Sequence, residues 1–124
     1  MLCDDASHSA IAPTCNRRGQ GHNHGGGLPA CSSCDLAVAA DDATFATSGV
    51  NIGLFCSTPM VALSRNVPRK QAMEMLLLGE FLPASSVAEI GLVNRVVPLS
   101  ELETASMDMA HIIANKSPLS LIHI

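Results

Sequence analysis

The segment between residues 34 and 98 alternates short strand-like runs with helix-like apolar spacing, and this alternation constrains the fold more than any other feature. Residues 35–40 form a short apolar run, which suits a buried strand but also fits a turn of buried helix. Residues 92–97 are rich in β-branched side chains and predict a strand ahead of Pro98. Helices between and after such strands favour a layered α/β fold.

Helix start and stop signals lie between and after these two runs. A helix is predicted to have Pro68 at its first position and to stop at Gly79 in a left-handed conformation. Ser85 and Ser86 are placed to cap a second, short helix that Gly91 closes. We interpret the apolar stripes of the first helix and of a third, later helix as core packing, and they comprise Ala72, Met73, Leu76 and Leu77, then Leu102, Ala105, Met109, Ile112 and Ile113.

The third helix has a possible capping box, because Ser100 and Glu103 stand at the spacing that lets the two side chains bond each other's backbone N–H groups.

Composition excludes several classes of protein. The 124 residues allow one domain, and the net charge of −4 without a basic run argues against a nucleic-acid partner. No apolar stretch reaches the length of a membrane span. The start "MLCDDASHSA" has neither a charged nor an apolar signal region, so the five cysteines are expected to be reduced thiols.

Residues 1–33 have no periodicity and are rich in Gly, His, Ser and Cys, which leaves two physical interpretations open. The first is a zinc site formed by His22 and His24 with Cys31 and Cys34, since imidazole and thiolate both bind zinc. This spacing matches no structural zinc site that we recognise, so no metal is assigned. The second is a disordered tail.

Four sequence blocks carry a resemblance to a known family. They are "CDLAVA", "FATSGVNIGLFCSTP", "ALSRNVPRKQAMEMLLLGE" and "AEIGLVNRVVP", in this order. Together they resemble the middle of the enoyl-CoA hydratase/isomerase (crotonase) family, and the second block is similar to the subgroup of the enoyl-CoA hydratase domain-containing protein 3 type. The resemblance implies that residues 34–118 are a partial crotonase-like domain. We therefore expect an α/β fold, the helix-rich fragment of a ββα spiral.

The same resemblance suggests an origin for the two ends of the chain. Read one nucleotide downstream, the codons of residues 14–32 allow "PVIAAVKGTTTAAGCQLVA", which is similar to the family sequence before "SCDLAVA". We therefore predict that residues 1–33 are an out-of-frame or disordered head, with residues 1–24 packing poorly. Residues 119–124, "LSLIHI", match a translated sequencing adapter and are expected to be a tail derived from it. A genuine apolar C-terminal strand is the alternative.

The family resemblance implies an acyl-CoA thioester as substrate, with no separate cofactor. Family enzymes hold the thioester oxygen with two backbone N–H groups, an oxyanion hole that stabilises an enolate-like state. One donor comes from a segment that this chain lacks. The other comes from the glycine of "AAGC", which exists only in the shifted frame. As written, Gly25, Gly26 and Gly27 occupy that region.

The resemblance also bears on catalysis, because family hydratases use two glutamates as acid and base. The second falls at Gly49, and the shifted frame puts a glutamine at the first. No catalytic residue is therefore assigned, and the chain as written is expected to be inactive. The acids outside the motif are expected to be solvated, and they are Glu74, Glu80, Glu89, Glu101 and Glu103.

The candidate substrate-binding residues match the family segment that lines the acyl pocket. They are Gly49, Val50, Leu54, Phe55 and Cys56. Cys56 is in principle a nucleophile, but His111 is far along the chain, so we expect a buried structural thiol.

Partners and location follow from the resemblance alone. The acyl-CoA thioester is the expected ligand, and the parent protein is expected to be a homo-oligomer, a trimer or hexamer, without nucleic-acid or membrane partners. It would be cytoplasmic if bacterial and mitochondrial if eukaryotic. Three alternatives stay open: a catalytically silent crotonase-fold protein that binds acyl-CoA, a small Cys/His metal-binding protein, and a non-functional fragment.

Overall fold

The computed structural model of the chain describes residues 11–15 and 27–124, and for residues 11–15, 27, 29 and 30 only the backbone is described. The elements in chain order are β1 (Ile11–Cys15), α1 (Gly27–Ser33), β2 (Leu36–Ala40), β3 (Thr44–Phe45), the 3-10 turn η1 (Ser48–Ile52), α2 (Ser57–Asn66), α3 (Arg69–Leu78), β4 (Leu82–Pro83), α4 (Ala84–Glu89), β5 (Arg95–Val97), the 3-10 turn η2 (Leu99–Glu101), α5 (Leu102–Ala114) and α6 (Pro118–Leu121).

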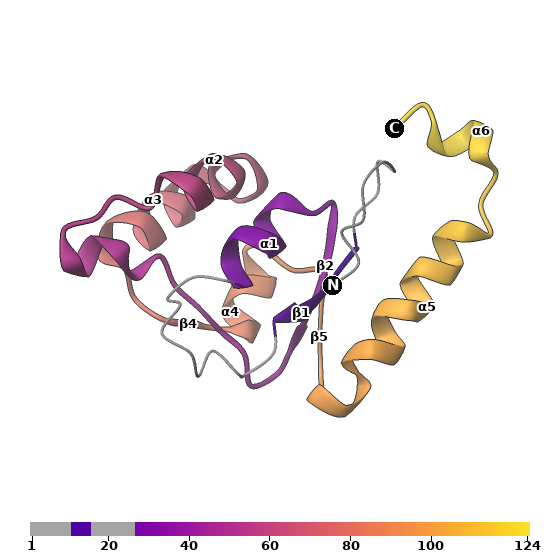
Figure 1. Cartoon of the computed structure of the whole chain (residues 1–124), viewed down its shortest axis with the longest axis horizontal. Helices are drawn as coiled ribbons and strands as arrows, with labels where there is room; N and C mark the ends of the chain where they lie inside the picture. The colour runs from indigo at the N-terminus through magenta and orange to yellow at the C-terminus, as the bar shows by residue number, and fades with distance from the viewer. Residues whose placement is uncertain (1–10, 16–26) are drawn as a thin grey trace.

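A parallel sheet in the order β1-β2-β5 forms the centre of the structure. In Figure 1, α5 lies on one side of this sheet, and α1, α2 and α3 lie on the other. A second, antiparallel pair joins β3 to β4 beside α4. Helices on both faces of a parallel sheet are the arrangement that the alternating sequence pattern predicts, so the expected α/β layering is confirmed.

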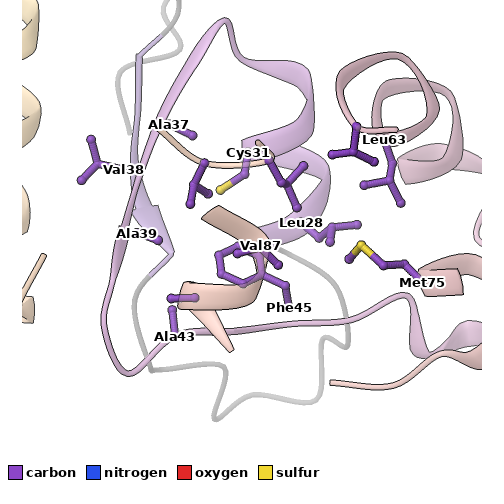
Figure 2. Packing of buried hydrophobic residues seen from close by; sticks show 14 of the residues in the cluster. Leu28, Cys31, Ala37, Val38, Ala39, Ala43, Phe45, Leu63, Met75 and Val87 are labelled. Carbon is purple, nitrogen blue, oxygen red and sulfur yellow. The ribbon is translucent and has the colours of Figure 1, made fainter. Parts of the chain in front are cut away.

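The core forms around β2, which is a strand and not a helical turn. Ala37 and Ala39 point toward α1, and Val38 between them points to the α5 side (Figure 2). This alternation follows from the two-residue period of a strand, and both faces are buried because helices cover both. Phe45 and Leu63 are the largest fully buried side chains of the cluster.

The helix boundaries differ from the predictions by about one turn or less. Gly79 ends α3 with φ of 63°, as predicted, but Pro68 is the residue before the helix and not its first position. Ser85 and Ser86 lie inside α4, which follows Pro83, so they do not cap it. Extended backbone at both prolines places the helix start one residue after each of them.

The predicted capping box at the start of the third helix is wrong. The chain forms η2 over Leu99–Glu101 first, and the residue before α5 makes no side-chain cap bond. The stripe of α5 is also rotated from the prediction, since Ser106 is buried and Ile112 is exposed. Ser106 is accommodated there because its hydroxyl donates a hydrogen bond to the backbone carbonyl of Leu102 at 2.8 Å.

The predicted head contributes elements to the fold. β1 pairs with β2, with Ile11 opposite Leu36, and α1 carries the buried Leu28 and Cys31. This pairing places backbone from residues 1–24 in the sheet, whereas the frame of the codons is a property of the nucleotides and stays a prediction. His22 and His24 of the hypothetical zinc site lie outside the described residues.

The tail is a short helix, α6, and not the apolar strand considered as the alternative. Its Leu119 and Ile122 are exposed. Within residues 27–124, no helix is long and apolar enough to span a membrane. Among the described side chains, no three His, Cys, Asp or Glu residues gather closely enough to hold a metal ion.

Candidate functional site

The predicted substrate-binding residues lie together on one turn, residues 49–56, between β3 and α2. The backbone N–H of Leu54 donates to the carbonyl of Gly49 at 2.9 Å, and the N–H of Gly53 donates to the carbonyl of Val50 at 3.2 Å. Gly53 takes a left-handed conformation with φ of 76°, which reverses the chain after η1. The turn is therefore closed by its own backbone hydrogen bonds.

The side chains of this turn differ in burial. Val50 and Cys56 are half-buried, whereas Leu54 and Phe55 are 63% and 62% exposed. Cys56 is therefore a half-buried thiol and not the buried one that the sequence predicts. Contiguous exposed apolar surface is where soluble proteins contact ligands or other protein segments.

Gly49 is packed so closely that a side chain there would require its neighbours to shift. A Cβ on Gly49 would lie 2.7 Å from Sγ of Cys56 and 2.9 Å from the backbone oxygen of Leu54. Both distances are shorter than van der Waals contact, and the second involves backbone that cannot rotate away. In this conformation the turn holds no carboxylate at the position where the family resemblance places a hydratase glutamate, and a side chain there would require Cys56 and the Leu54 backbone to shift.

Two side chains hold the turn against the C-terminal end of α3. The hydroxyl of Thr47 donates a hydrogen bond to the backbone carbonyl of Met75. The amide Nδ2 of Asn51 donates to the carbonyl of Gly79 at 3.2 Å. The sequence pattern alone predicts a role for neither residue. Their signal was weak: two polar residues flank Gly49, but their acceptors lie 28 residues further along the chain.

Gly79 belongs to the same contact. Besides its left-handed backbone, a Cβ there would lie 2.5 Å from Cγ1 of Val50. The stop signal for α3 therefore also lets the turn approach the helix closely. On either side of Gly79, the end of α3 and the following loop expose further apolar side chains, namely Leu77, Leu78 and Phe81.

The glutamates and the described histidines lie outside this turn and are exposed to solvent. All five glutamates predicted to be solvated are exposed, which confirms that prediction. His111 lies exposed on α5, across the sheet from the turn (Figure 1). No histidine among the described residues therefore accompanies Cys56, and the turn carries no Asp, Glu, His, Lys or Arg side chain.

Comparison with known proteins places these observations in a family. The family model described as enoyl-CoA hydratase/isomerase matches residues 19–124, a range that includes Gly25 to Gly27 and the tail. The mitochondrial enoyl-CoA hydratase domain-containing protein 3 of Mus musculus is 52% identical over 91 residues, which cover 73% of this chain and 30% of that protein.

Solved structures agree with the sequence relatives. The crystal structure of human enoyl Coenzyme A hydratase domain-containing protein 3 is 52% identical, with a TM-score of 0.68, and the match covers 73% of this chain and 36% of that chain. An enoyl-CoA hydratase from Mycobacterium smegmatis is 55% identical with a TM-score of 0.67, covering 70% and 34%.

The chain spans about a third of the length of the relatives that it matches. Over that part, the predicted crotonase-like fold and the resemblance carried by the four sequence blocks are confirmed. The chain belongs to the enoyl-CoA hydratase/isomerase family.

Proposed function

We propose that this chain contributes the acyl-contacting turn of a protein that binds an acyl-CoA thioester. The carrying observation is that Leu54 and Phe55 stay exposed on a turn whose backbone is closed by hydrogen bonds. A ready-made turn that presents apolar side chains loses little conformational entropy when an acyl chain covers it. The proposal requires acyl-CoA alone, with no further cofactor.

The chemistry proposed for the parent protein is oxyanion stabilisation. Two backbone N–H groups would hold the thioester oxygen as negative charge develops on it. By family resemblance one donor belongs to the glycine region that precedes α1, and α1 begins at Gly27. The other belongs to a segment that this chain does not contain, so this chain alone is proposed to be inactive.

A catalytically silent binding protein is the second candidate, and Gly49 favours it. Hydration requires a positioned acid and base, and Gly49 supplies no carboxylate to this turn, where even a Cβ would require Cys56 to shift. The silent protein and an enzyme that uses only the oxyanion hole share the same acyl-contacting turn. They differ in turnover, which binding measurements do not detect.

A calorimetric titration tests the proposal. Butyryl-CoA is titrated into the chain, with free CoA as the matched ligand that lacks the acyl group. We expect butyryl-CoA to bind more tightly than CoA. The double variant Leu54→Ser/Phe55→Ser should lose at least about tenfold in affinity, because burying one large apolar side chain contributes about 1.5–3 kcal/mol.

The control for this titration is Leu119→Ser, which removes an equally exposed apolar side chain on α6. It should leave the affinity for butyryl-CoA unchanged. Equal affinity for butyryl-CoA and CoA, or no effect of the double variant, would contradict the proposal.

Assembly and location of the parent protein are also proposals. The family resemblance supports a trimer or hexamer, which analytical ultracentrifugation of the longer protein tests. The relatives named mitochondrial support that compartment for a eukaryotic source, and a bacterial source implies the cytoplasm. Cell fractionation followed by peptide mass spectrometry distinguishes the two.

A further inference from the structure

We propose that Thr47 and Asn51 are positioning residues, which set the orientation of the acyl-contacting turn by holding it to the end of α3. The inference rests on the proposed function of that turn. It concerns a different property, since neither residue presents an apolar side chain to a ligand. Both act through the backbone that carries Leu54 and Phe55.

The first contact is buried. Thr47 is 2% exposed, and its hydroxyl donates to the carbonyl of Met75. The same carbonyl accepts the N–H of Gly79 at 3.1 Å, the bond that closes the last turn of α3. Thr47 therefore bonds to the point at which the helix ends. A buried hydroxyl that loses its acceptor is costly, so this contact is directional and persistent.

The second contact lies beyond the helix end. Gly79 is the residue that follows α3, and the amide of Asn51 donates to its carbonyl at 3.2 Å. Val50, the residue before Asn51, packs against Gly79 so tightly that a Cβ would lie 2.5 Å from it. One of the two hydrogen bonds therefore starts from the residue before η1, and the other starts from a residue within it.

These contacts matter because the tip of the turn has little packing of its own. Leu54 and Phe55 are mostly exposed, so contacts with the core do not decide where they point. The closed backbone of residues 49–54 transmits its orientation to them. That orientation is fixed by Thr47 and Asn51, and loss of either should loosen the whole turn.

Cys56 supplies a readout that is independent of ligand binding. Its Sγ lies against the Gly49 backbone and it is a half-buried free thiol. Alkylation of the full chain with iodoacetamide, followed by peptide mass spectrometry, reports how often this thiol is exposed. Thr47→Val and Asn51→Ala should each raise the labelling rate about fivefold, the population change that loss of one hydrogen bond produces.

Two matched variants separate positioning from general damage. Thr47→Ser retains the hydroxyl and should retain the parental labelling rate. Ser64→Ala removes an exposed hydroxyl that donates to the carbonyl of Val61 at 3.2 Å on α2, and it should also leave the rate unchanged. Asn51 is exposed, so its variant keeps the test valid even where Thr47→Val fails to fold.

Butyryl-CoA affinity of the same variants completes the test. Faster labelling together with affinity weakened about fivefold supports the proposal. Unchanged labelling of Cys56 in both Thr47→Val and Asn51→Ala overturns it. If the variants label faster but the unsubstituted chain binds no butyryl-CoA, the proposed function is overturned. The faster labelling would still support the role of Thr47 and Asn51 in holding the turn to α3.

Discussion

Two hydrogen bonds join Asn94 to Ala37. The N–H of Ala37 donates to Oδ1 of Asn94 at 2.7 Å, and the N–H of Asn94 donates to the carbonyl of Ala37 at 2.8 Å. The side chain thereby extends the ladder between β2 and β5 by one step. β5 itself begins at the next residue, Arg95, and not at the predicted Leu92.

Replacing Asn94 should weaken the sheet. Asn94→Leu leaves the N–H of the buried Ala37 without its acceptor, and we expect a loss of about 1–3 kcal/mol in the free energy of unfolding. Urea unfolding at low protein concentration measures it. Asn94→Asp retains an acceptor oxygen and should lose less. Equal stability of the Leu variant and the parent would contradict this account.

A side chain at Gly49 should lower the stability of the chain. We expect Gly49→Ala to destabilise the chain by about 1–3 kcal/mol, the usual cost of overpacking, because the Cβ meets both Cys56 and the backbone of Leu54. Adding Cys56→Ala should recover part of that loss but not all, since the Leu54 oxygen remains. The double-mutant cycle is measured by the same urea unfolding, and strict additivity of the two changes would be inconsistent with the contact.

The chain should not hydrate crotonyl-CoA. Removing one oxyanion donor lowers a rate about a hundred- to a thousand-fold, and removing an acid–base group lowers it about a hundred- to ten-thousand-fold. Gly49→Glu should not restore hydration, because its Cβ would displace Cys56 and the backbone of Leu54 and so distort the turn. The reaction is followed by the loss of the enoyl absorbance of crotonyl-CoA. Turnover by the unsubstituted 124-residue chain would show that the active site lies elsewhere.

The exposed apolar residues at the end of α3 should promote self-association. Leu77 and Phe81 are 61% and 63% exposed, on a chain that spans about a third of its relatives. Leu77→Lys/Phe81→Lys should shift the chain toward monomer in sedimentation velocity. Thr104→Lys/Ala114→Lys adds the same two positive charges at exposed positions of α5 and is the control. A parent chain that is already monomeric at high concentration would contradict the prediction.

The frame of the head can be decided from nucleotides. If residues 14–32 are out of frame, their codons read one base downstream should encode a sequence similar to the family segment that precedes residue 34. The experiment is resequencing of the source transcript across residues 1–33. Codons of residues 25–31 that do not permit this reading would exclude the frameshift, and the pairing of β1 with β2 would then belong to the native chain.

Local sequence determined much of this fold. The apolar run at residues 35–40 became β2 because consecutive apolar side chains suit a strand covered on both faces. Gly79 ended α3 because glycine adopts the left-handed conformation at little cost. The second sequence block spans the turn of residues 49–56, and its contact with an acyl chain stays a proposal.

Tertiary structure decided the long-range hydrogen bonds that hold the turn and the sheet in place. Neither local spacing nor composition pairs Thr47 with Met75, or Asn94 with Ala37, because each pair joins residues far apart in the chain. The exposure of Leu77 and the burial of Ser106 likewise depend on which face of each helix meets a neighbour. Periodicity shows that a helix has an apolar side, but only packing against other elements determines how that side is rotated and which polar groups it shelters.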